Sequence, residues 1–323
     1  MNLVAKVLLS GACAIGVQLA AAQGYPNRPI RLIAPSSAGG PVDVIARIVA
    51  LGLADQLGQQ IVIDNRAGAA GLIGAELVAR SAPDGYTLLF GFSGPLAIVP
   101  NLNNTTPYDT LKDFAPVTLA ASAPYVLLVH PGVPAKSVRE LVALAKSQPG
   151  RLNYASGGTG TGIHMAGELF NLAAGVQIQH LPYKGAAPAQ TALMAGEASM
   201  MFNGLSPALP FVKSGKLRAL AVGGNKRTAL LPDVPTVAEN GFDFHTTGWY
   251  GIVAPKGTPR AIVNKVRTDT VRTLAAPEIK DKLTALAVEG IGSTPEEFSA
   301  LLREEMAKWA RVIRTAGLKG KTS

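Results

Sequence analysis

The chain of 323 residues carries 30 Lys and Arg against 21 Asp and Glu, a formal net charge of +9 at pH 7. A basic balance can indicate a nucleic-acid partner, but aromatic residues make up only 6% of this chain and the cations are scattered along it. We therefore predict no nucleic-acid partner and a solvated basic surface instead. The single cysteine excludes an internal disulfide and a thiolate metal site.

Residues 1–22 have the order of a secretory signal peptide. Lys6 precedes an apolar stretch, and Ala20-Ala21-Ala22 supplies small residues just before Gln23. The apolar stretch has about 13 residues, too few to span a bilayer comfortably. We predict cleavage near Gln23 and export to the periplasm. Lipid attachment at Cys13 is a weaker alternative, because cleavage there would cut the apolar stretch in half.

Short apolar runs and helical patterns alternate along the rest of the chain. Apolar residues at 45, 48, 49 and 53 share one face of a first helix. Capping boxes precede two later helices, at Ser137 with Glu140 and at Thr294 with Glu297. The expected strands, bounded by Gly, Pro or Asn, are Ile30–Ala34, Ile61–Asp64, Thr87–Gly91, Tyr125–His130, Leu152–Ala155, Gln177–Leu181, Ser199–Phe202, Leu217–Val222 and Tyr250–Ala254. This order predicts an α/β fold with mostly parallel sheets.

Two segments have the features of crossovers between domains. Ala121–Pro124 and His245–Trp249 each lead into a strand that a proline follows. We predict a first lobe of residues 23–122 plus 250–323 and a second lobe of residues 123–249. Two crossings give a two-strand hinge with a cleft, the arrangement of a Venus-flytrap (type II-like) periplasmic binding protein.

One glycine-rich loop falls in each predicted lobe, after a strand and before a helix. The first runs Pro35-Ser36-Ser37-Ala38-Gly39-Gly40, and the second runs Ser156-Gly157-Gly158-Thr159-Gly160-Thr161-Gly162. Such loops direct free backbone N–H groups and the positive end of a helix dipole at one place. Two of them on facing lobes predict a protein that holds a small anion.

Motifs of enzymes are incomplete in this chain. Gly91-Phe92-Ser93-Gly94-Pro95 lacks the last glycine of a nucleophile elbow, and no histidine follows His245. His164 and Glu168 share a helix face, but no further His or Cys lies nearby to complete a metal site. We predict no catalytic residue, no metal and no cofactor. The alternative is an exported α/β hydrolase that uses Ser93 or Ser156.

Several blocks of sequence, in order, resemble the receptors of tripartite tricarboxylate transporters, the Bug family of extracytoplasmic solute receptors. The resemblance covers essentially the whole chain after residue 22. Its clearest blocks are Tyr25-Pro26-Asn27-Arg28-Pro29-Ile30, Asp64-Asn65-Arg66-Ala67-Gly68-Ala69-Ala70-Gly71, Ala82-Pro83-Asp84-Gly85-Tyr86-Thr87, Asn153-Tyr154-Ala155-Ser156, Pro182-Tyr183-Lys184-Gly185 and Pro232-Asp233-Val234-Pro235-Thr236.

The resemblance implies a receptor, not an enzyme, that captures a small organic carboxylate and delivers it to membrane permease subunits. We expect such a receptor to be a monomer. The same closure would also serve a sensor with a membrane signalling partner. Transferred by position, the contacts expected from the first loop are Ser36, Ser37, Ala38, Gly39, Gly40 and Asp43, and those from the second are Ser156, Gly158, Thr159, Gly160, Thr161 and His164.

Four of the candidate residues have a simpler structural explanation as well. Asp43 also favours the dipole of its helix, and His164 also suits a place beneath its loop. Ser93 and Asn203 follow strands whose carboxyl ends would face the cleft, although a plain turn explains Ser93 equally. Trp249 at the hinge either covers the ligand or packs against other side chains at the crossover.

The first loop departs from the family pattern. Relatives usually carry Pro-Phe-Pro-Pro-Gly-Gly, whereas this chain has serines and an alanine before its two glycines. Loss of the ring and of two prolines predicts a roomier, more polar loop and a different ligand.

Overall fold

The structure is a computed structural model that describes residues 24–103 and 105–320, and the predicted signal peptide lies outside them. Its strands are β1 (Ile30–Ala34), β2 (Ile61–Asn65), β3 (Thr87–Phe92), β4 (Phe114–Val129), β5 (Asn153–Ser156), β6 (Gln179–Pro182), β7 (Met200–Gly204), β8 (Arg218–Val222), β9 (Thr247–Pro255) and β10 (Glu289–Gly290). The α-helices are α2 (Pro41–Leu57), α3 (Leu72–Ala79), α4 (Val99–Leu102), α5 (Thr110–Asp113), α6 (Val138–Ser147), α7 (Gly162–Ala174), α8 (Ala186–Met194), α9 (Leu205–Lys213), α10 (Arg260–Ala275), α11 (Pro277–Thr284) and α12 (Pro295–Thr315). Short 3-10 or π segments are η1 (Ala69–Gly71), η2 (Gly94–Ile98) and η3 (Ala238–Asn240).

The strands form one long sheet in the order β2-β1-β3-β9-β4-β7-β5-β6, and β8 and β10 also pair with β4. The expected parallel pairing holds among β1, β2 and β3 and among β5, β6 and β7. In contrast, β9 and β4 run antiparallel to their neighbours, so the sheet as a whole is mixed. The predicted α/β two-lobed fold is confirmed.

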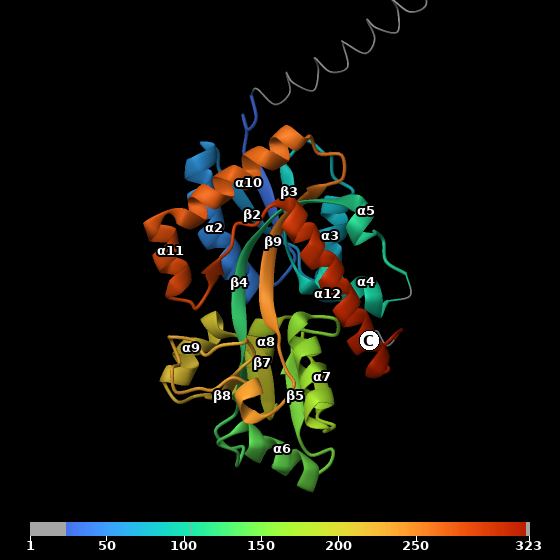
Figure 1. Cartoon of the computed structure of the whole chain (residues 1–323), viewed down its shortest axis with the longest axis vertical. Coiled ribbons are helices and arrows are strands. Elements are labelled where there is room, and N and C mark those ends of the chain that lie inside the picture. Colours follow the sequence, from blue (N-terminus) through green and yellow to red (C-terminus); the bar gives the residue numbers. More distant parts are fainter. Residues whose placement is uncertain (1–23, 104, 321–323) are drawn as a thin grey trace, which may run out of the picture.

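The long strands β4 and β9 join the two lobes (Figure 1). The first half of β4 pairs with β9, and its second half, from Tyr125 to Val129, pairs with β7 and β8. The two expected crossovers lie against each other here, since Ser122 is opposite Trp249 and Pro124 is opposite Thr247. The lobe boundaries given from the sequence stay a prediction.

Helices cover both faces of each lobe's part of the sheet, with α2, α3, α10, α11 and α12 on the first lobe and α6 to α9 on the second (Figure 1). Ile45, Val49 and Leu53 of α2 are buried, as the sequence pattern predicts, and Ile48 packs on the same cluster while partly exposed. The capping box at Thr294 is complete. Ser137 caps α6, but Glu140 accepts from the N–H of Lys136 instead of that of Ser137.

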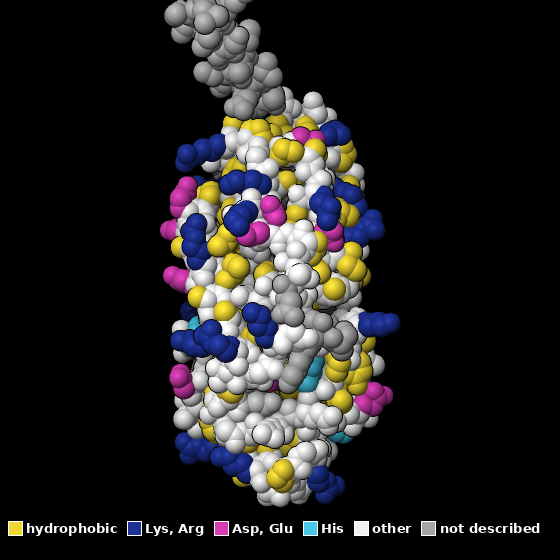
Figure 2. All heavy atoms as spheres, turned by 90° about the vertical axis from the view of Figure 1, so that its right-hand side faces the viewer, with side chains coloured by type: hydrophobic (Ala, Val, Ile, Leu, Met, Phe, Trp, Pro, Cys, Tyr) yellow, Lys and Arg dark blue, Asp and Glu magenta, His cyan; other side chains and the backbone are white. Residues whose placement is uncertain are grey.

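Side chains of α7 bring the lobes into contact away from the hinge. Met165 of α7 is buried in one cluster with Leu302 of α12 and Leu102. None of the helices in the described part of the chain is long and apolar enough to cross a membrane. On the face in Figure 2, Lys and Arg side chains are spread over both lobes among acidic and neutral groups, consistent with a solvated basic surface.

Candidate ligand-binding site

A cavity of about 630 Å³ lies between the two lobes. Loops of both lobes and the hinge strands enclose it. Its lining includes Ser36, Ser37, Gly40 and Val42 of the first loop and α2, residues 67–71, Phe92, the hinge tyrosines Tyr125 and Tyr250, residues 157–159 and 161–163, and residues 182–186.

The two lobes touch around this cavity. A Cβ built on Gly185 of the second lobe would lie 2.5 Å from Oγ of Ser37, and one built on Gly160 would lie 3.1 Å from the side chain of Val99. A Cβ on Gly204 would lie 3.0 Å from the ring of Pro41. The glycines therefore permit a close approach of the two lobes around the cavity.

Asp43 orders the first loop from beneath. Its carboxylate accepts from the N–H of Gly39 at 2.9 Å and from Nδ2 of Asn65 at 3.0 Å, and Arg47 Nη2 lies 3.0 Å from it. Burial by itself would raise the pKa of Asp43. The hydrogen bonds from Arg47, Gly39 and Asn65 outweigh that effect and hold the pKa below its ordinary value. Asp43 is only 3% exposed, and its carboxylate is hydrogen-bonded to groups of its own lobe.

Residues 67–71 form a third loop on the cavity, and the sequence analysis assigned it no role. Ala69 and Ala70 have φ of 45° and 54°, which places two residues with a side chain in the left-handed region. Backbone of this kind costs energy and occurs most often at functional sites. The signal in the sequence was Gly68-Ala69-Ala70-Gly71 directly after the second strand, because glycines at such spacing mark a sharp loop before a helix.

The second glycine loop is held by hydroxyl groups. Ser156 Oγ accepts from the N–H of Gly158 at 3.1 Å, and Thr161 Oγ1 donates to the carbonyl of Gly158 at 2.8 Å. Thr161 also caps α7 by accepting from the N–H of His164. These contacts fix the shape of the loop, in which Gly158 and Thr159 line the cavity.

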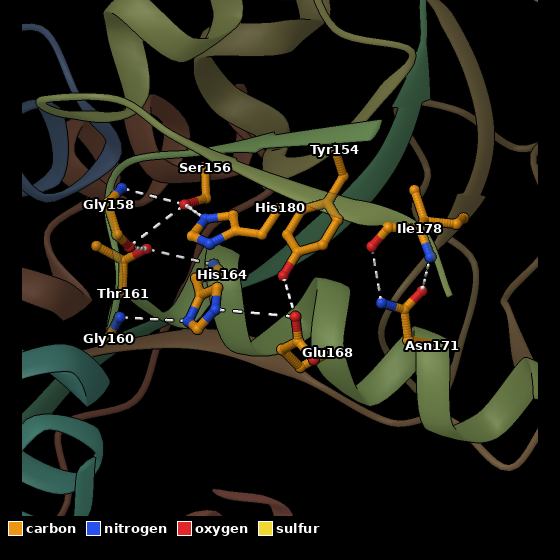
Figure 3. A network of polar contacts seen from close by, with 10 residues as sticks. All are labelled: Tyr154, Ser156, Gly158, Gly160, Thr161, His164, Glu168, Asn171, Ile178 and His180. Atoms are coloured by element: carbon orange, nitrogen blue, oxygen red, sulfur yellow. Dashed lines mark hydrogen bonds and ion pairs between the residues drawn. The ribbon is translucent and has the colours of Figure 1, made fainter. Parts of the chain in front are cut away.

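Two histidines lie beneath this loop (Figure 3). The rings of His164 and His180 are 4.1 Å apart between centroids, His180 Nε2 lies 2.6 Å from Ser156 Oγ, and His164 Nδ1 accepts from the N–H of Gly160. Burial lowers the pKa of His164 to about 3, with the neighbouring His180 adding to the effect, and lowers the pKa of His180 to about 4. Both rings are therefore neutral at pH 7.

A tyrosine and a carboxylate complete this buried network. The hydroxyl of Tyr154 donates to Glu168 Oε1 at 2.5 Å, and His164 Nε2 lies 3.9 Å from the same oxygen. Burial and the Glu168 carboxylate raise the pKa of Tyr154. Ser156 is fully buried, so its contact with His180 holds the loop without presenting a nucleophile to the cavity. Within residues 24–103 and 105–320, no group of three His, Cys, Asp or Glu side chains could hold a metal ion.

The residues singled out from the sequence divide into two sets. Six of them line the cavity, namely Ser36, Ser37, Gly40, Gly158, Thr159 and Thr161. The others are not among the lining residues: Ala38, Gly39, Asp43, Ser93, Ser156, Gly160, His164 and Asn203. A ligand contact by any of the fourteen stays a prediction.

Several residues of the second set have a visible structural role. Asn203 is buried, donates to Gln190 Oε1 at 2.7 Å and accepts from the N–H of Gly204. Ser93 is buried and hydrogen-bonds with the hydroxyl of Tyr125. Trp249 packs edge-on against Phe298 and donates to Glu305, outside the cavity lining.

The cavity contains aromatic and cationic side chains that the sequence analysis did not assign to the site. Phe92 comes from the end of β3, Tyr125 and Tyr250 come from within β4 and β9, and Tyr183 and Lys184 come from the turn after β6. Of these residues, only Tyr183 and Lys184 were indicated by the sequence, because they lie in one of the blocks that carry the resemblance.

Comparisons with known proteins agree with this geometry. BugT of Bordetella pertussis is 37% identical over 300 residues, which cover 92% of each chain. A solved periplasmic transporter is 39% identical with a TM-score of 0.88, covering 91% of this chain and 99% of that one.

Two further solved structures are named with their ligands. An R. palustris protein with adipate is 35% identical with a TM-score of 0.87, covering 91% of this chain and 98% of that one. MatC from Rhodopseudomonas palustris with bound malate is 33% identical with a TM-score of 0.85, covering 90% and 100%.

Residues 45–318 match the receptor of the tripartite tricarboxylate transporter family. This match spans most of the chain and confirms the resemblance seen in the sequence blocks. Family members are solute-binding receptors without enzymatic activity, which excludes the hydrolase alternative. The chain belongs to the tripartite tricarboxylate transporter receptor family.

Proposed function

We propose that this chain is a periplasmic receptor that captures a small organic carboxylate between its lobes and delivers it to the permease subunits of a tripartite tricarboxylate-type transporter. One observation carries the proposal: glycine-rich loops from both lobes line one cavity between the lobes. The solved relatives with adipate and with malate support a carboxylate as the ligand. The signal-peptide pattern of residues 1–22 and the solved periplasmic transporter support export.

Capture follows from the placement of the loops. In an open form one lobe offers its loop to the carboxylate, and closure then brings the second loop to the same group. Each charge-assisted contact from an N–H or hydroxyl group contributes about 1.5–3 kcal/mol before desolvation. Neither lobe alone makes all the contacts, so tight binding requires closure, and the closed form is the one that a permease would recognise.

Binding is tested by calorimetric titration of the exported protein, without residues 1–22, with a panel of carboxylates. We expect saturable binding of at least one carboxylate and no product. The chain's only two tryptophans, Trp249 and Trp309, both lie near the hinge, so their fluorescence should change as the lobes close. Absence of binding across the panel, or release of product from any member, would contradict the proposal.

Delivery is tested in the bacterium of origin by uptake of the identified carboxylate. Deletion of the gene should abolish high-affinity uptake, and the intact gene should restore it. Unchanged uptake in the deletion strain, together with tight binding in vitro, would assign the closed form to a signalling partner instead of a permease.

A further inference from the structure

We infer that the ligand of this receptor is a carboxylate with an aromatic ring, held with its carboxylate at the loops and its ring on the hinge side of the cavity. This inference rests on the proposed function and names the substrate class of that same site. Three features of the cavity carry it: its charge, its walls and its size.

The charge of the lining selects an anion and rejects a zwitterion. Among the described residues, Lys184 is the only charged side chain on the cavity, and it has neither a hydrogen bond nor an ion pair with another described residue. No carboxylate side chain lines the cavity, since Asp43 is buried behind it and bound to Arg47 and Asn65. A ligand ammonium group would therefore lose its water without gaining a charged partner, which disfavours amino acids.

The walls of the cavity favour a ligand whose main part is apolar. Phe92 at the end of β3, and Tyr125 and Tyr250 within β4 and β9, bring three aromatic rings to the hinge side of the cavity, and Val42 and Ile163 add aliphatic surface. The Tyr125 hydroxyl already hydrogen-bonds with Ser93. The carboxylates of a tricarboxylate cannot all be matched by such walls, whereas a ring gains both apolar burial and ring–ring contact.

The rings of Phe92, Tyr125 and Tyr250 lie on the hinge-side strands, whereas Lys184 and the serine and threonine hydroxyls lie on loops, and this arrangement orients the ligand. Ser36, Ser37, Thr159 and Lys184 belong to the loops of the two lobes. The Lys184 turn lies next to the first loop, because a Cβ on Gly185 would be 2.5 Å from Ser37 Oγ. The carboxylate therefore belongs with these loops, and the opposite end of the ligand faces the hinge rings.

The size of the cavity accommodates a ring. About 630 Å³ falls in the range of pockets that enclose drug-sized ligands. A four-carbon acid would leave much of this volume to water against apolar walls. The first loop contributes to the room, because it brings only the small side chains of Ser36 and Ser37 to the lining ahead of Gly40.

The test is calorimetric titration of the wild-type protein with benzoate, cyclohexanecarboxylate, hexanoate, succinate, citrate and glutamate. We expect benzoate to bind about three- to tenfold more tightly than cyclohexanecarboxylate, which has a similar shape but no π system. We expect hexanoate to be weaker still, because its chain loses more rotational freedom. Citrate and glutamate should be the weakest.

The outcomes separate this inference from the proposed function. If succinate or hexanoate binds as tightly as benzoate, or more tightly, the ring preference is wrong and the carboxylate receptor stands. If no member of the panel binds, the proposed function fails as well.

Two variants locate the two ends of the ligand. Phe92→Leu should weaken the binding of benzoate about three- to tenfold and leave that of hexanoate nearly unchanged. Phe211→Leu, at a partly buried position in the second lobe, is the matched control.

Lys184→Gln should weaken the binding of every carboxylate about tenfold or more. Lys213→Gln, at an exposed position, is the control. For Phe92→Leu, two ligands are compared on one variant, so a general loss of stability does not imitate the result. For Lys184→Gln, an unchanged Tm makes the same distinction. An equal effect of Phe92→Leu on both ligands, or no effect of Lys184→Gln, would overturn the assigned orientation.

Discussion

At the scale of single residues, the buried histidine pair shows how this receptor shapes its second loop with neutral groups. His164 accepts from the N–H of Gly160, and His180 contacts the Ser156 hydroxyl that holds Gly158. Protonation of His164 would remove the acceptor that Gly160 uses. The loop geometry therefore depends on imidazoles that stay uncharged, which burial ensures at neutral pH.

This arrangement predicts a loss of stability in weak acid. In the unfolded chain both histidines bind a proton near pH 6.5, whereas in the folded protein their pKa values are about 3 and about 4. Between these limits the unfolded state holds more protons, so the free energy of unfolding falls as the pH falls, by at most about 1.4 kcal/mol per pH unit for each histidine. Thermal unfolding of His180→Gln at pH 7 and pH 5 should show a smaller decrease of Tm than the wild type. An equal decrease in both proteins would refute the role of this pair.

At the scale of elements, α12 is tied to the hinge through one carboxylate. Glu305 Oε2 accepts from Nε1 of Trp249 on β9 and from Nε1 of Trp309 on α12, both at 2.9 Å, and Lys308 lies 3.3 Å from Oε1. Both indoles are nearly fully buried. A buried N–H without an acceptor is costly, so one side chain secures the contact of the last helix with the strand that joins the lobes.

Glu305→Ala should therefore destabilise the protein by about 2–4 kcal/mol, since it leaves two buried indole N–H groups unsatisfied. Glu304→Ala is the matched control, because Glu304 is exposed on the same helix turn and its removal should change stability by less than about 0.5 kcal/mol. Urea unfolding measures both. A similar loss in the two variants would show that the helix, and not the shared carboxylate, decides the effect.

At the scale of the whole molecule, the glycines at the lobe contacts set how far the protein can close. Gly185 has φ of 121° and Ser37 of the opposite lobe directly beside it. Gly175 at the end of α7 has φ of 61° and nothing within 4 Å of its built Cβ. A side chain at either position strains the backbone, but only at Gly185 does it obstruct the other lobe.

Gly185→Ala should accordingly weaken ligand binding about tenfold, because the closed form that makes all the contacts is penalised. Gly175→Ala should lower Tm through backbone strain and leave the dissociation constant unchanged. Calorimetric titration with the best carboxylate of the panel, combined with thermal unfolding, distinguishes the two effects. Equal dissociation constants for wild type and Gly185→Ala would show that closure does not involve this contact.

Much of the fold was readable from local patterns. The strand β1 has the expected bounds, and α2 follows the glycine loop as expected, because a buried strand, a turn and an amphipathic helix each depend on residues close in sequence. The part of β4 before Tyr125 was not predicted as a strand, and only Ala121–Pro124 within it was predicted as a crossover. Its small residues and prolines have a weak strand signal, and pairing with β9, far away in the chain, makes it a strand.

Local patterns were enough to predict the α/β order, the two glycine-rich loops and the family, because these follow from short segments of sequence. Which side chains meet at the cavity depends on contacts between distant parts of the chain. Asp43 and His164 were withdrawn behind their loops, whereas Lys184 and the hinge aromatic rings were brought onto the cavity. The physical reason is that burial and long-range contact decide whether a side chain is already satisfied or is left for a ligand, and neither is encoded in the spacing of neighbouring residues.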